Sequence, residues 1–134
     1  MLRACAAVAT AVLTFGSPAA IAHAEPEQPD QAGCTYTLTA PSVVTVSGVE
    51  MVTAIVDTGA CDGAVTYQTV ACIEMVGGNG PGRCEEGSGI VPAQVFFQPY
   101  RPGATYIATG RGCAAKGNPP QKYCRENGPL TAVL

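Results

Sequence analysis

The tripeptide Asp57-Thr58-Gly59 is the part of this sequence whose residue types and order most directly suggest chemistry. A carboxylate presented by a glycine turn can act in general acid–base catalysis. A turn at the end of a strand has the same composition, so a purely structural role is the alternative interpretation.

Histidine chemistry is excluded from most of the chain. His23 is the only histidine, and Ala22-His23-Ala24 follows an apolar run with small residues at the two positions that a signal peptidase recognises. We predict a cleaved signal peptide over residues 1–24, a mobile leader over 25–33 and one domain over 34–134. A domain without histidine cannot use Ser-His-Asp or Cys-His catalysis, nor an imidazole zinc site.

Charge is unevenly distributed along the expected domain. Acidic side chains dominate up to residue 98, whereas five basic side chains against the single Glu126 follow it, and the whole sequence has a formal net charge of −3. Five dispersed basic residues on an acidic protein are typical of a solvated face, so we expect no nucleic-acid partner. The apolar run of the signal peptide is too short to be a permanent membrane anchor, and no later apolar stretch approaches ~18 residues, so we expect a secreted protein without a transmembrane anchor.

Six cysteines remain after the signal peptide, an even number in an exported chain, which indicates three disulfides. A zinc site made of cysteines alone would need closer pairs. We therefore expect no metal and no cofactor. The six residues are Cys34, Cys61, Cys72, Cys84, Cys113 and Cys124.

A hairpin turn at Ser47-Gly48 predicts the first disulfide. The turn pairs Val46 with Val49 and, followed along the ladder, sets Cys34 opposite Cys61. The same register predicts an apolar face made of Tyr36, Leu38, Ala40, Val44, Val46, Val49, Met51, Thr53 and Ile55.

Two shorter loops predict the other disulfides. Cys72–Cys84 would close the base of the glycine-rich loop Gly77–Gly82, and Cys113–Cys124 would close the basic loop Lys116–Lys122. The glycine loop does not resemble a phosphate-binding loop, because no helix start and no Lys-Ser/Thr pair follow it. Further strands are predicted over Val65–Met75, Ile90–Gln98 and Leu130–Leu134.

The segment that contains Pro102, Gly103 and Tyr106 resembles the corner before the penultimate strand of fibronectin type III and immunoglobulin-like sandwiches. The resemblance implies an all-β sandwich in which the tyrosine hydroxyl bonds back to the backbone. The antibody-type core is absent, because the chain has no tryptophan and no cysteine two residues beyond Tyr106. The whole chain resembles small exported cysteine-rich proteins of actinobacteria, which implies export and disulfides but no activity.

The hexapeptide from Ile55 to Ala60 resembles the active-site motif of retropepsin-type aspartic proteases. That resemblance implies a homodimer with Asp57, Thr58 and Gly59 as the catalytic triplet. Against it, a disulfide at Cys61 would tether the loop that should lie at the dimer seam.

We predict a disulfide-stapled, immunoglobulin-like β-sandwich that acts as a monomeric, non-enzymatic binding module on a protein or cell-envelope partner. Loops carry the function on such a scaffold. The candidate contact residues are Tyr100 and Arg101 in one loop and Lys116 and Lys122 in another. A secreted protease inhibitor and the retropepsin-like protease are the alternatives.

Overall fold

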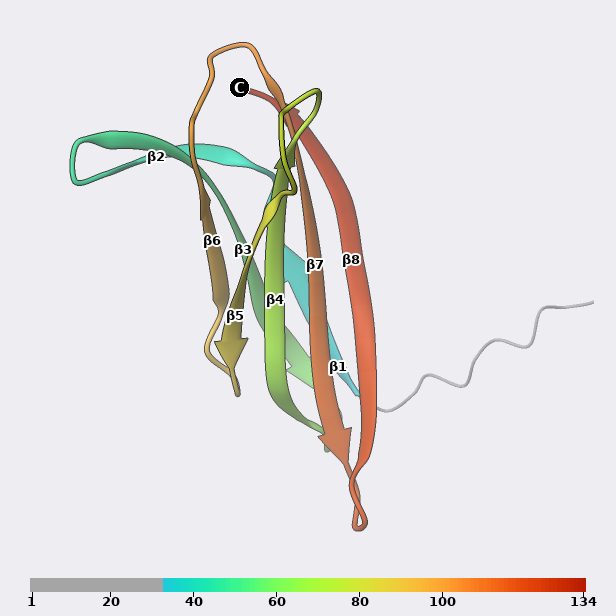
Figure 1. Ribbon diagram of the computed structural model, residues 1–134. Coiled ribbons are helices and arrows are strands. Elements are labelled where there is room, and N and C mark those ends of the chain that lie inside the picture. Colours follow the sequence, from blue (N-terminus) through green and yellow to red (C-terminus); the bar gives the residue numbers. More distant parts are fainter. Residues whose placement is uncertain (1–32) are drawn as a thin grey trace, which may run out of the picture.

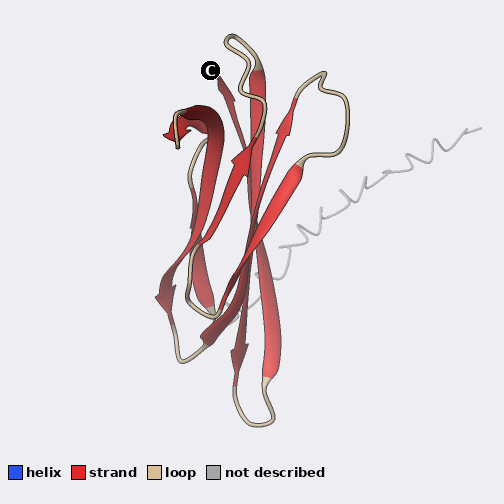
Figure 2. Cartoon of the chain, turned by 60° about the vertical axis from the view of Figure 1, so that its left-hand side comes forward, coloured by secondary structure: helices blue, strands red, loops and turns tan. Residues whose placement is uncertain are grey.

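The computed structural model describes residues 33–134, which form eight strands and no helix (Figures 1 and 2). The predicted signal peptide and all but the last residue of the predicted leader lie outside these residues. Within the described part, no helix long and apolar enough to cross a membrane is found.

The strands form two antiparallel sheets. In the first, the β3 sheet, β1 and β2 follow one edge of β3 and β6 follows the other. In the second, the β4 sheet, the order is β5-β4-β7-β8. The prediction of an all-β sandwich is therefore confirmed. The bounds are β1 Cys34–Leu38, β2 Ser42–Val46, β3 Val49–Cys61, β4 Val65–Met75, β5 Arg83–Ser88, β6 Ala93–Phe97, β7 Thr105–Lys116 and β8 Gln121–Val133.

All three predicted disulfide pairings are confirmed. Cys34–Cys61, Cys72–Cys84 and Cys113–Cys124 each join residues that lie directly opposite one another on neighbouring strands. Each disulfide therefore links two strands of one sheet, and none links the two sheets.

The predicted register of the first hairpin is correct only in part. Val46 pairs with Val49 across the Ser47-Gly48 turn, whose two residues both have positive φ, and Cys34 pairs with Cys61. Between these points the register shifts by one residue.

The shift places Tyr36 opposite Thr58 and Leu38 opposite Val56. The bulge between Cys34 and Tyr36 causes it at one end, and the break between β1 and β2 at Ala40-Pro41 restores the register at the other.

This shift corrects the predicted apolar face. Val52, Ala54 and Val56 of β3 are fully buried, whereas Met51 and Ile55 are only partly buried. Because the side-chain period of a strand is two, one bulge is enough to exchange the face that meets the core. The core contains mainly small aliphatic side chains and one large ring, namely Val52, Ala54, Val56, Ala71, Ile73, Ala93, Val95, Tyr106 and Ala108.

Two predicted strands differ in extent from the observed ones. The strand expected over Ile90–Gln98 begins only at Ala93, because Pro92 has no amide hydrogen and Val91 closes a turn onto the Ser88 carbonyl. The strand expected over Leu130–Leu134 belongs to the much longer β8. That edge strand is mostly exposed, so its sequence lacks the apolar alternation from which a strand is predicted. Strand β5 was not predicted.

The connecting loops gather at the two ends of the sandwich. The β4–β5 loop, the β6–β7 loop and Leu134 lie at one end, while the β7–β8 hairpin projects at the other (Figure 1). The first of these ends is called the glycine-loop end below, and it contains the loops of residues 76–82 and 98–104.

Candidate functional site

The β4–β5 loop is glycine-rich and is held at its base. Cys72–Cys84 joins the two strands that enter and leave it, and the Gly78 amide donates to the Met75 carbonyl at 3.1 Å. Gly77 and Gly80 have φ angles of 71° and 111°, which are conformations that other residues rarely adopt. The glycines therefore set the path of the loop, and the disulfide fixes where it starts and ends.

The β6–β7 loop is held from the core by Tyr106. The Tyr106 hydroxyl accepts a hydrogen bond from the Arg101 amide at 2.8 Å and donates to the Pro99 carbonyl at 3.3 Å. The side chain of Tyr106 is fully buried, so the loop is anchored to the rigid interior. The expectation that this hydroxyl bonds back to the backbone is confirmed.

Two further contacts fix the same loop. The Ala104 amide donates to the Arg101 carbonyl at 3.1 Å, and Gly103 has a φ of 80°, as a tight turn with proline and glycine at its centre requires. Leu134 pairs through its backbone with Gly103 and Ala104. The loop is therefore restrained by the buried Tyr106 side chain, by its own turn and by the backbone of Leu134.

The two loops enclose a cavity of about 200 Å³ at the glycine-loop end. Met75 and Phe97, which also pack against the core, provide its apolar lining. Phe97 meets the ring of Tyr106 edge to face, with 6.0 Å between ring centroids. The lining residues are Met75, Gly77, Gly78, Asn79, Gly80, Pro81, Phe97, Gln98, Pro99 and Arg101.

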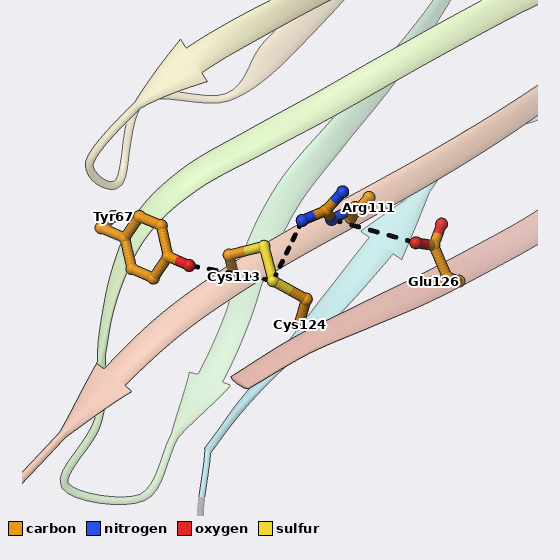
Figure 3. Close-up of polar contacts among 5 residues, drawn as sticks. All are labelled: Tyr67, Arg111, Cys113, Cys124 and Glu126. Carbon is orange, nitrogen blue, oxygen red and sulfur yellow. Dashed lines mark hydrogen bonds and ion pairs between the residues drawn. A yellow bond between two sulfur atoms is a disulfide. The ribbon is translucent and has the colours of Figure 1, made fainter. Parts of the chain in front are cut away.

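A second hollow, of about 360 Å³, lies on the outer face of the β4 sheet. It is larger, but regular strands line it, and Arg111 and Glu126, two of its three charged side chains, already lie close to one another. Figure 3 shows Arg111 donating to the Cys124 sulfur at 3.4 Å and lying 3.9 Å from the Glu126 carboxylate, while the Tyr67 hydroxyl lies 3.8 Å from the same sulfur. This hollow lies on exposed strand faces and its cation already has a counter-charge, so the smaller cavity between loops is the better candidate site.

The structure places Asp57 within β3 and not in a turn. Its backbone lies opposite Thr37 and its side chain is exposed. Thr58, which the retropepsin resemblance assigns to bracing the carboxylate, instead donates its hydroxyl to Thr66 at 3.1 Å. Gly59 lies at the bulge, where a β-carbon would come within 2.7 Å of the Thr35 hydroxyl. The glycine is therefore explained by close strand packing.

The other candidate residues are divided between the two ends of the molecule. Arg101 lines the cavity, whereas Tyr100 is partly buried and packs against the core. Lys116 and Lys122 belong to the β7–β8 hairpin at the opposite end, where the Lys122 ammonium lies 5.2 Å from the centre of the Tyr67 ring. The structure therefore does not bring the two candidate loops together.

Sequence reasoning did not connect Met75, Asn79 and Phe97 to a site. The glycine loop and the Arg101 loop were separate features in the sequence, and nothing local indicates that they meet. Among the described residues, no group of three or more histidine, cysteine, aspartate or glutamate side chains could hold a metal ion.

Comparison with known proteins leaves the geometry as the basis for any functional assignment. No protein-family model matches the chain, and no curated protein or solved structure matches it significantly.

Proposed function

We propose that this protein is an exported, non-enzymatic binding module that contacts a protein partner, free or held in the cell envelope, through its glycine-loop end. The observation that carries the proposal is the cavity between two loops that are both held in place before any partner arrives. A disulfide closes one loop, and the buried Tyr106 hydroxyl anchors the other. Such pre-organisation lowers the entropy that is lost on binding and so favours recognition.

The arrangement of the strands supports an immunoglobulin-like scaffold. The chain crosses between sheets after β3, β5 and β6, and β5 lies beside β4 on the sheet that also contains β7 and β8. An additional strand occupies this position in variable-type immunoglobulin sandwiches. The comparison supports the scaffold only, because the binding loops of those sandwiches correspond to the β3–β4 and β7–β8 connections, at the end opposite the cavity.

Export is supported by the disulfides. Three of them in a small domain are typical of proteins that work in oxidising compartments. The core of this domain consists largely of alanine and valine, so covalent links between strands supplement a modest hydrophobic term.

Neither alternative function gains support from a specific contact. An inhibitor loop that mimics a substrate needs an extended backbone with free hydrogen-bonding groups. At Arg101 the amide is bonded to Tyr106 and the carbonyl accepts from Ala104. Asp57 is exposed on a regular strand, and its expected partner threonine bonds elsewhere.

The proposed function is tested by photocrosslinking in the cells that export the protein. A photoreactive residue would replace Asn79 in the glycine loop or, as a matched control, Asn118 at the tip of the β7–β8 hairpin. Both are exposed loop asparagines at opposite ends of the sandwich. We expect a discrete crosslinked protein from position 79 and none from position 118.

A crosslink from position 118 alone would assign binding to the opposite end and contradict the proposal. Equal, diffuse products from both positions would indicate non-specific contact and would contradict it as well.

A further inference from the structure

Arg101 is a cation without a counter-charge at the mouth of the candidate site. It is the one charged side chain among the residues that line the cavity. Its hydrogen bonds in the described chain use the backbone only, whereas Arg83 pairs with Glu85 and Arg111 with Glu126. The guanidinium is therefore free to bind a group from outside.

Residues with unused backbone donors also line this cavity. Asn79 and Gly80 line it, and no hydrogen bond within the described residues uses their amides. A guanidinium and unused backbone N–H groups around one cavity are suited to an anion, because every one of these groups donates and none accepts.

The size and lining of the cavity favour a carboxylate on a short apolar stem. At about 200 Å³ it is smaller than typical small-molecule pockets, which span roughly 300–1,000 Å³, so one inserted side chain fits better than a whole ligand. Met75 and Phe97 can contact methylene groups, for which a free phosphate has no counterpart. Glutamate combines the charged head with such a stem.

We infer that the cavity binds an acidic side chain of the protein partner. Arg101 forms an ion pair with the carboxylate, and the backbone amides of the glycine loop donate hydrogen bonds to it. The inference rests on the proposed function and names the chemistry of the group recognised. It also explains why the loop is glycine-rich at this place, since small residues leave the amides of Asn79 and Gly80 accessible to a ligand.

The experiment is an NMR titration of the purified, isotope-labelled protein with N-acetylglutamate amide. N-acetylglutamine amide, which has the same shape without the charge, is the matched probe. We expect saturable shifts of the Asn79 and Gly80 amides with the glutamate probe and none with the glutamine probe. Inorganic phosphate should bind more weakly than the glutamate probe, because it has no apolar stem to contact Met75 and Phe97.

Variants at Arg101 test its role. Arg101→Gln should lower the affinity for the glutamate probe about 10- to 100-fold, which is the usual effect of losing hydrogen bonds to a charged group. Arg101→Lys should retain part of the affinity, because it keeps the charge but loses the planar fork. Arg111→Gln on the outer face should bind the probe as the parent protein does. Neither change at Arg101 removes its amide bond to Tyr106, so the melting temperatures of these two variants should equal that of the parent protein.

Equal binding of the glutamine probe, tighter binding of phosphate, or unchanged affinity in Arg101→Gln would overturn the inference. A crosslink at position 79 without any response to the glutamate probe would contradict the carboxylate assignment alone. Absence of that crosslink would contradict the proposed function, whatever the probe does.

Discussion

At the scale of single residues, Tyr106 links the core to the candidate site. Its ring fills the interior between the sheets, and its hydroxyl holds the backbone of the β6–β7 loop at Pro99 and Arg101. A buried tyrosine usually needs such a partner for its hydroxyl, and here the partner is the loop itself. One side chain therefore contributes both packing and loop position.

We predict that Tyr106→Phe lowers the free energy of unfolding by about 1–3 kcal/mol, because the Pro99 carbonyl and the Arg101 amide lose their hydrogen bonds while the ring volume is kept. Tyr100→Phe is the matched control, since the Tyr100 hydroxyl makes no hydrogen bond within the described residues and that change should be nearly neutral. Urea denaturation measures both. Equal stabilities for the two variants would show that the loop does not depend on the Tyr106 hydroxyl.

At the scale of elements, β7 contains glycines where a core strand would ordinarily place apolar side chains. Gly110 and Gly112 face the β3 sheet. A β-carbon on Gly110 would meet Val56 at 2.5 Å, and one on Gly112 would lie 2.2 Å from the ring of Tyr36. Glycine in a strand interior often marks such a close approach. The Tyr36 ring therefore occupies space that β7 leaves open.

Gly112→Ala should destabilise the domain by about 1–3 kcal/mol, because the added methyl group overpacks against Tyr36. Thr109→Ala, on the exposed face of the same strand, is the control and should change the melting temperature little. Calorimetry of the two variants is the measurement. If Gly112→Ala were as stable as the parent protein, Tyr36 would have to move freely, contrary to the close contact.

At the scale of the whole molecule, disulfides stabilise each sheet, whereas hydrophobic packing holds the two sheets together. Each disulfide joins neighbouring strands of one sheet. Contact between the sheets therefore depends on a core of mainly small aliphatic residues and on polar bonds such as that from the Asn127 side chain to the Tyr36 carbonyl at 2.9 Å. The disulfides stabilise the hairpins, and the core assembles them.

Removing either short disulfide should cost about 3 kcal/mol in the chain-entropy estimate, since the sequence separations are 12 for Cys72–Cys84 and 11 for Cys113–Cys124. Double serine variants of the two pairs therefore form matched controls for one another. Only loss of Cys72–Cys84 should speed amide hydrogen exchange in Gly77–Gly82 and lower the affinity for the glutamate probe. The same loop exchange in both variants would mean that the disulfide does not pre-organise the site.

Much of the fold was predictable because it depends on local chemistry. The Ser47-Gly48 turn, the alternation along Val65–Met75 and the three disulfides each involve hairpins or loops whose ends are close in the sequence. The Tyr106 contact with its own loop is local as well. Local features of this kind are visible in one sequence, since turn residues and a period of two are enough to reveal them.

The strand faces and the edge strands were harder to predict. The bulge beside Thr35 exchanged the inner face of β3, and Gly59, the residue that marks the bulge, is equally typical of a turn. Strand β8 is exposed along most of its length, so its pairing with β7 is a backbone property without an apolar pattern. Pairing through the backbone does not depend strongly on side-chain type, which is why sequence patterns did not reveal it.

The sequence by itself determined the composition of the candidate site, namely a glycine loop closed by a disulfide and a turn that contains Arg101. Only the tertiary structure decided that these two features form one cavity. Met75 ends a strand of one sheet and Phe97 ends a strand of the other, so they line the same cavity only after the sheets pack. That packing is a non-directional burial of apolar surface, and no local pattern of residues specifies which loops it brings together.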